Sequence, residues 1–140
     1  MNVLVVDASV ILKWILPPGS EDCQQQAWAI SDAVGDRRVE IKVPFLWFFE
    51  VGNLLARRYP AQAEQQLGDL LVALGPGESL SAPDWQHQIL ALTTRHRVTF
   101  YDAAYHALAI VNEGIFVTAD EKYLKAVGDD KHAMLLKDWR

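Results

Sequence analysis

Short apolar runs alternate with segments of helical length along this chain, and this alternation limits the folds it can adopt. The first run, residues 3–6, is continuous and rich in valine, which is typical of a central strand in a parallel sheet buried on both faces. The pattern predicts five strands, at residues 2–7, 40–43, 78–82, 115–118 and 133–137.

Helices are predicted between these strands, with stops at proline and glycine. They cover residues 8–16, 20–35, 45–58, 61–74, 83–95, 101–113 and 120–127, and Ser20 is the expected cap of the second. Alternating strands and helices favour an α/β fold with a mainly parallel sheet covered by helices on both faces. Because no repeat or long linker divides the chain, residues 1–140 are expected to form one domain.

Composition narrows the class of protein. Hydrophobic residues make up 51% of the chain and charged residues 22%, which is the balance of a globular protein. The single cysteine, Cys23, allows no internal disulfide, so a reducing, cytoplasmic compartment is expected. The first apolar run is too short for a signal peptide, and no segment approaches the ~20 apolar residues of a membrane-spanning helix.

Four acidic residues stand where an apolar segment ends or within a predicted helix: Asp7, Glu50, Asp102 and Asp120. An ionised carboxylate beside apolar sequence is costly without a partner. Taken singly, each aspartate also has a simple explanation, because a carboxylate at a helix start caps free N–H groups. Glu50 has no such explanation in mid-helix, where the alternative is a glutamate on the solvent face.

Taken together, the acids favour a shared divalent cation. Helices that follow parallel strands begin along one edge of the sheet, so the aspartates would be neighbours that raise one another's pKa values. All candidate ligands are oxygens, and the four histidines form no zinc-binding pair, so Mg²⁺ or Mn²⁺ is expected. Such an ion lowers the pKa of a bound water and stabilises charge on a phosphodiester.

Three polar residues are candidates to support this cluster. Ser9 follows Asp7 closely and helps to satisfy free N–H groups at the helix start. Asn53 lies three residues after Glu50 on the same helix face. Thr118, two residues before Asp120, is placed to donate a hydrogen bond into the cluster.

The motifs VVDASVILKW, EVGN, YDAAYHALA and VTADEKYL occur in the order and spacing of a PIN-domain ribonuclease. The chain resembles the VapC-type toxin of a bacterial toxin–antitoxin pair from Asn2 to about Leu136. The resemblance implies a PIN-like three-layer sandwich with strand order 3-2-1-4-5 and the activity of a metal-dependent endoribonuclease. It implies metal binding and catalysis by Asp7, Glu50, Asp102 and Asp120, supported by Ser9, Asn53 and Thr118.

The resemblance also implies partners: an RNA substrate, a cognate antitoxin protein that lies in a groove between N-terminal helices, and a second copy of the chain in a homodimer. Candidates for the groove or the dimer interface, or else for ordinary core, are Trp14, Trp28, Trp47 and Phe48. Candidates for contact with the RNA backbone, or else for solvated surface, are Lys13, Arg37, Arg38, Arg57, Arg58, Arg95 and Arg97. His106, one helical turn after Asp102, faces either the acids or the core.

Two other functions remain open at the level of sequence. One is a different metal phosphohydrolase on a related α/β fold, although Ser9 stands where a phosphatase with an aspartyl nucleophile favours a second aspartate. The other is a non-catalytic, metal-binding or protein-binding α/β module. Cleavage of RNA with Mn²⁺ or Mg²⁺ present separates a nuclease from a binding module.

Overall fold

The computed structural model describes residues 2–79 and 82–140. Within these ranges the chain forms a sheet of four parallel strands in the order β2-β1-β3-β4. The strands are β1 (Asn2–Val6), β2 (Val39–Lys42), β3 (Ile115–Thr118) and β4 (Ala133–Leu135). β1 lies between β2 and β3, the central position that its continuous apolar run predicted.

The predicted strand at residues 78–82 is reduced to one bridge in the part that the structure describes. Glu78 forms an isolated parallel bridge with Pro44, directly after β2, while residues 80 and 81 lie outside the described residues. Pro44 has no N–H to donate, which limits pairing at this edge. The bridge occupies the place of the third strand in the order 3-2-1-4-5, and the four strands of the sheet follow that order.

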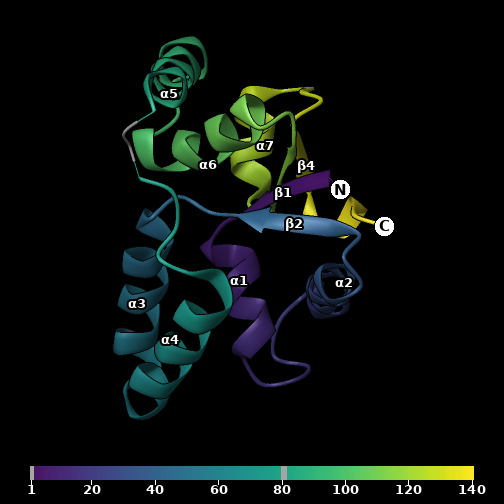
Figure 1. Ribbon diagram of the computed structural model, residues 1–140, viewed down its shortest axis with the longest axis vertical. Helices are drawn as coiled ribbons and strands as arrows, with labels where there is room; N and C mark the ends of the chain where they lie inside the picture. The colour runs from purple at the N-terminus through teal and green to yellow at the C-terminus, as the bar shows by residue number, and fades with distance from the viewer. Residues whose placement is uncertain (1, 80–81) are drawn as a thin grey trace.

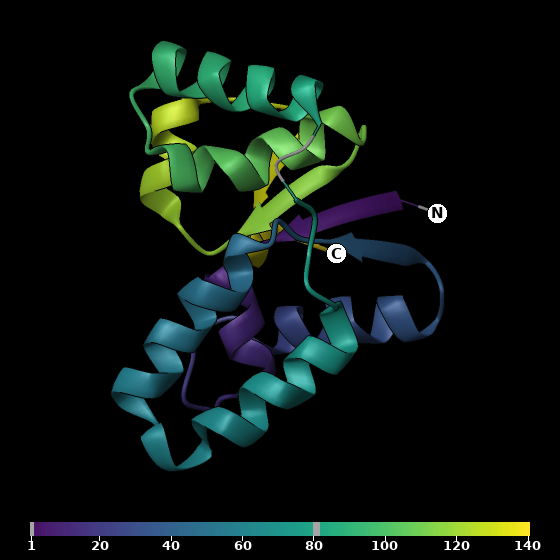
Figure 2. The same ribbon diagram turned by 60° about the vertical axis from the view of Figure 1, so that its left-hand side comes forward.

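Helices cover both faces of the sheet, as predicted. Figures 1 and 2 show α1 to α4 on one side and α5 to α7 on the other, which gives three layers. The helices are α1 (Ala8–Ile15), α2 (Gln24–Gly35), α3 (Leu46–Arg58), α4 (Pro60–Leu74), α5 (Pro83–His96), α6 (Phe100–Val111) and α7 (Glu121–Val127).

Two apolar clusters fill the spaces between the layers. Because neighbouring residues of a strand point to opposite faces, Leu4 and Val6 of β1 join the cluster beneath α1 to α4, whereas Val5 joins the cluster beneath α5 to α7. β3 approaches β1 so closely that a Cβ atom at Gly114 would lie 2.4 Å from the carbonyl oxygen of Val3. The absence of a side chain at Gly114 therefore permits this central pairing.

Two predicted boundaries are wrong. Ser20 does not cap α2, because its hydroxyl donates to the carbonyl of Pro17 and α2 begins at Gln24 instead. The Gln24 side chain donates to carbonyls at and beyond the end of α1, which folds residues 17–23 into a compact connection. The last strand stops at Leu135 and gives way to a 3₁₀ helix, η1 (Leu136–Asp138), where a strand to residue 137 was predicted.

Candidate metal centre

The fold brings the four predicted acids to one edge of the sheet. Asp7 directly follows β1 and caps α1, and Asp120 follows β3 and caps α7. Asp102 lies in the first turn of α6, and Glu50 lies within α3. Because β1 and β3 are neighbouring parallel strands, Asp7 and Asp120 stand at the same carboxyl edge, which is where ligands bind in open α/β sheets.

Two hydroxyl groups hold the Asp7 carboxylate. Its Oδ1 accepts from the Ser9 N–H at 3.1 Å and from the Ser9 hydroxyl at 2.5 Å. Its Oδ2 accepts from the Thr118 hydroxyl at 2.5 Å, which is the hydrogen bond expected from sequence. With both oxygens engaged, the carboxylate has one orientation, and its remaining lone pairs point away from these donors.

The same hydroxyls connect Asp7 to Asp120. Thr118 Oγ1 accepts from the Asp120 N–H at 3.0 Å, and Ser9 Oγ accepts from the Ala119 N–H at 3.1 Å. Asp120 Oδ1 in turn accepts from the Tyr123 N–H at 3.0 Å, so its side chain caps α7 as its position predicted. Hydrogen bonds between side chains and backbone N–H groups therefore connect the start of α1 to the end of β3.

Tyr105 holds Glu50 and was not among the predicted site residues. Its hydroxyl donates to Glu50 Oε1 at 2.5 Å, which joins α6 to α3. Tyr105 follows Asp102 by three positions, so both lie on one helix face, and this spacing is the only sequence signal for it. Thr99 supports the same helix, because its hydroxyl oxygen accepts from the Asp102 N–H at 3.1 Å.

Burial raises the pKa values of three of the acids. The pKa of Asp7 is raised chiefly by loss of hydration, against the hydrogen bonds from Ser9 and Thr118. The pKa of Glu50 is raised by the same cause, against the hydrogen bond from Tyr105. Burial also raises the pKa of Asp102. The folded chain thus makes their ionised forms costly.

The negative charges of these four acids, the acid cluster, add to this cost. Asp102 raises the pKa of Asp7, and both raise the pKa of Glu50. Asp120 raises the pKa of Asp102. Burial and Glu50 together raise the pKa of Tyr105 far above its usual value, so its hydroxyl remains a proton donor to Glu50. A cation at this edge would offset the mutual repulsion.

The donor set suits a hard divalent cation. Within the described part of the chain, no three or more His, Cys, Asp or Glu side chains form a group that could hold a metal ion. Mg²⁺ does not require one, because it keeps several waters and binds proteins through one or two carboxylates. Buried carboxylate oxygens fixed by Ser9, Thr118 and Tyr105 therefore fit Mg²⁺ or Mn²⁺, with water completing the coordination.

Asn53 and His106 make no hydrogen bond to the four acids among the described residues. The Asn53 side chain is exposed and makes no hydrogen bond to the acids among the residues described. His106 is fully buried and turned to the core, with Nδ1 2.8 Å from the Tyr123 hydroxyl and Nε2 3.2 Å from Asp130 Oδ2. Burial lowers the pKa of His106, against the charge of Asp130. It links α6 to α7 and contacts none of the acids directly.

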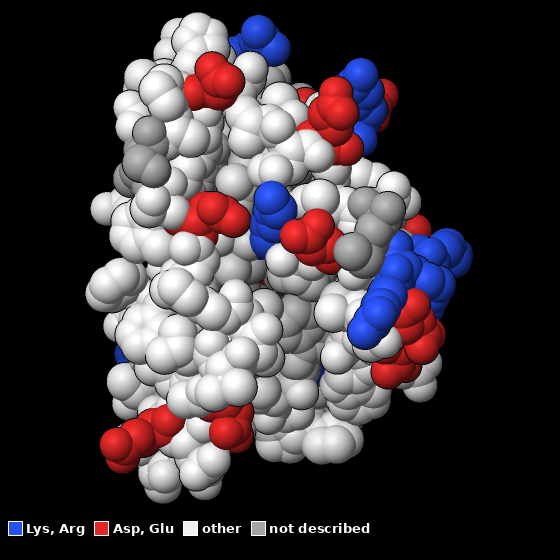
Figure 3. Space-filling model, viewed as in Figure 1, with Lys and Arg blue, Asp and Glu red and all other residues white. Residues whose placement is uncertain are grey.

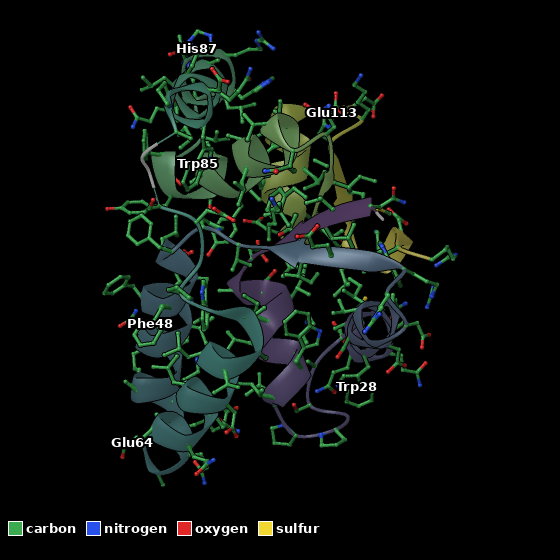
Figure 4. All side chains as sticks on the ribbon, viewed as in Figure 1. Trp28, Phe48, Glu64, Trp85, His87 and Glu113 are labelled. Carbon is green, nitrogen blue, oxygen red and sulfur yellow. The ribbon has the colours of Figure 1, made fainter. Side chains whose placement is uncertain are left out.

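The predicted groove or interface aromatics do not form one surface. Trp47 is fully buried and donates to the Gly75 carbonyl at 3.2 Å, and Trp14 donates to the Ala27 carbonyl at 2.7 Å, so both fix the packing of helices. Phe48 on α3 and Trp28 on α2 are half-buried and lie on either side of α1 (Figure 4). Two exposed aromatic residues directly precede acids of the cluster: Phe49 precedes Glu50, and Tyr101 precedes Asp102.

The structure is thus an α/β protein with a parallel sheet between two helical layers and acidic residues from different elements near the carboxyl edge of that sheet. The sequence matches the PIN domain family over residues 4–129, and the chain belongs to this family. Among proteins with curated functions, none matches the sequence. None of the described helices combines the length and apolar character needed to cross a membrane.

Solved structures with this fold include toxin–antitoxin complexes. The chain is similar to PAE2754 from Pyrobaculum aerophilum, with 22% identity, a TM-score of 0.65 and coverage of 97% of this chain and 92% of that one. It is similar to a toxin–antitoxin complex from Klebsiella pneumoniae, with 14% identity, a TM-score of 0.66 and coverage of 95% and 97%. A third is VapBC2 from Rickettsia felis bound to a DNA fragment from its promoter, with 14% identity, a TM-score of 0.65 and coverage of 95% and 96%.

Proposed function

We propose that this protein is a metal-dependent endoribonuclease that hydrolyses RNA phosphodiester bonds and serves as the toxin of a toxin–antitoxin pair. The observation that carries the proposal is the convergence of Asp7, Glu50, Asp102 and Asp120 at one sheet edge, at a cost in charge repulsion. Membership of the PIN family and the likeness to toxin–antitoxin complexes support it.

The acids are proposed to bind Mg²⁺ or Mn²⁺ and to carry catalysis. When bound, such an ion lowers the pKa of a water molecule and offsets the charge that develops on the phosphate. Ser9 and Thr118 hold Asp7 in one orientation, and Tyr105 holds Glu50. A carboxylate of the cluster is proposed to take the proton of the attacking water.

Partner surfaces are proposed around α3. Phe45 and Phe49 pack edge to face, with ring centroids 6.4 Å apart, and their side chains are exposed. Figure 3 shows that the surface over α3 and α4 carries few charges. An exposed, weakly charged aromatic surface fits a protein partner, so this region is proposed to contact the antitoxin or a second copy in a homodimer. The single cysteine, Cys23, forms no disulfide within the chain, which accords with the cytoplasmic location proposed for such a pair.

Cleavage of RNA tests the proposal. Purified protein is incubated with total RNA and Mn²⁺ or Mg²⁺, and new RNA ends are located by sequencing. We expect discrete new ends with the wild-type chain and a loss of about a thousandfold or more in rate with Asp7→Asn. Asp7→Asn keeps the shape of the side chain, so an unchanged circular dichroism spectrum is expected. Absence of cleavage by the wild-type chain with either metal, or retention of activity by Asp7→Asn, would contradict the proposal.

A further inference from the structure

One member of the acid cluster, Asp120, borders a cavity of about 770 Å³. Lys13 of α1, Lys137 of η1 and Asp120, a member of the acid cluster, all line it. Asp22, Glu121 and Leu136 complete much of its wall. Of the basic residues proposed from sequence to contact RNA, Arg37 lines a different hollow beside β2, which none of the four acids borders. Lys13 alone among them shares this cavity with a site acid, within the described residues.

Lys13 is buried, which is unusual for a lysine. Its side chain is only 9% exposed, and its ammonium lies 3.6 Å from Glu21 Oε1. At that separation the contact is an ion pair and not a hydrogen bond, so it does not use the three N–H donors of the ammonium. A buried ammonium at the wall of a cavity, with donors to spare, suits an anionic ligand.

Lys137 is half-exposed and also pairs with a glutamate. Its ammonium donates a hydrogen bond to Glu121 Oε1 at 3.3 Å, which leaves two of its N–H donors unused. The side chains of Glu21 and Glu121 are 37% and 70% exposed, so either carboxylate stays hydrated when an incoming anion shares or replaces its contact. Replacing a glutamate by a ligand anion at either lysine therefore costs little free energy of desolvation, and both lysines are available to a ligand.

Part of the remaining wall is apolar. Leu135 and Leu136 contribute to the lining at the end of β4, and Ala119 does so directly before Asp120. A volume of this size falls within the range of sites that hold small organic ligands. Apolar surface beside two ammonium groups matches a nucleotide, which joins a sugar and a base to a phosphate.

We propose that this cavity is the subsite for the nucleotide next to the scissile phosphodiester, with Lys13 and Lys137 binding its phosphate. The inference rests on the proposed ribonuclease function and adds how the strand is held. Three acids, Asp22, Asp120 and Glu121, share the cavity with the two lysines. Asp120 belongs to the candidate metal centre, where a bound cation offsets its charge and favours the entry of a polyanion.

Binding of RNA in a cleavage-deficient background tests this subsite. Asp7→Asn protein is titrated with a labelled pool of short random-sequence RNA in Mg²⁺, and fluorescence anisotropy is followed over a range of KCl concentrations. Lys13→Met and Lys137→Met are added singly, because methionine keeps the apolar stem and removes the charge. Lys125→Met is the matched control, since Lys125 is exposed on α7 outside the cavity lining.

We expect each cavity variant to weaken RNA binding about tenfold and to reduce the slope of log K against log salt by roughly 0.7. Lys125→Met should have a smaller effect than the cavity variants on both the RNA affinity and the salt slope. Lys137 is half-exposed, so Lys137→Met tests the subsite even if Lys13→Met melts early. If Asp7→Asn binds RNA and both cavity variants match Lys125→Met, this inference is overturned and the proposed function stands. If the wild-type chain cleaves no RNA and Asp7→Asn binds none, both fail.

Discussion

Glu50 occupies a helix position where local structure gives no reason for a carboxylate. Loss of hydration and the charges of Asp7 and Asp102 raise its pKa, and the hydrogen bond from Tyr105 only partly opposes them. In the metal-free protein the ionised form of Glu50 therefore destabilises the fold that surrounds it. A residue that lowers stability in this way is typical of a binding site and not of a packing position.

Substitution of Glu50 by glutamine should separate stability from function. The amide oxygen introduced by Glu50→Gln still accepts from Tyr105 while the charge is removed, so we expect the metal-free protein to gain roughly 1 kcal/mol, or about 3 °C in Tm. We also expect Mn²⁺ affinity to fall at least tenfold. Thermal melting in EDTA and calorimetric titration measure the two effects. Glu64→Gln is the control, because Glu64 is exposed on α4, far from the acids (Figure 4). A lower Tm for metal-free Glu50→Gln would refute the repulsion argument.

At the scale of elements, α6 and α7 position two of the acids and are fastened to each other by a buried hydrogen bond. α6 carries Asp102, and α7 is capped by Asp120. Between them the Tyr123 hydroxyl lies 2.8 Å from Nδ1 of the fully buried His106. The distance between the Asp102 and Asp120 carboxylates thus depends on the hydrogen bond between Tyr123 and His106, in which neither carboxylate takes part.

Removal of that contact should loosen both the fold and the site. Tyr123→Phe leaves a buried His106 nitrogen unpaired, so we expect a loss of about 2 kcal/mol in the free energy of unfolding. Because α7 then has more freedom relative to α6, Mn²⁺ affinity should fall several-fold although no ligand is altered. Urea denaturation and metal titration provide the measurements. Tyr59→Phe serves as the control, since the Tyr59 hydroxyl makes no hydrogen bond among the described residues. Equal stability of both variants would contradict the role of Tyr123.

Local pattern predicted the elements and the convergence of the acids, because strand and helix periods and the edge of a parallel sheet are properties of short segments. It did not predict Tyr105, which contacts Glu50 across 55 positions of sequence. Helical spacing also placed His106 near Asp102 without deciding which side it faces, and the structure turns Tyr105 to the acids and His106 to the core. The pattern predicts a strand at residues 78–82 because composition does not reveal that Pro44 limits pairing at that edge.

The cavity beside Asp120 was likewise beyond the reach of sequence. Lys13 was predicted only as one of several basic residues that either contact RNA or lie on the solvated surface, and its burial follows from the way α1 packs against the connection to α2. Its partner Lys137 comes from the other end of the chain, in a segment predicted as strand. Contacts between distant segments determine which charged side chains share a cavity. Local sequence patterns predict only the helices and strands that carry those side chains.

At the scale of the whole molecule, protons and metal compete for the same carboxylates. The pKa values of Asp7, Glu50 and Asp102 are raised in the folded chain, so protonation stabilises the metal-free fold at low pH and this contribution is lost as pH rises through the raised values. The lowered pKa of buried His106 acts in the opposite sense, because its contribution is lost as pH falls. The pH dependence of the free energy of unfolding of the metal-free protein therefore combines two opposing trends.

The stabilisation that Mn²⁺ provides should isolate the acids, because His106 contacts none of them and its contribution cancels between the two conditions. At a Mn²⁺ concentration of about 100 Kd near neutral pH, binding should add roughly 2.7 kcal/mol to the free energy of unfolding. This gain should shrink steadily as pH falls, since protonated carboxyl groups no longer bind the ion. Urea denaturation in EDTA and in Mn²⁺ across the pH range measures it. In Asp7→Asn, which keeps three of the four acids, the gain at the same Mn²⁺ concentration should be smaller than in the wild-type chain at every pH. A gain that stays constant as pH falls would show that Mn²⁺ binds away from these carboxylates, and the metal centre assigned to this sheet edge would be wrong.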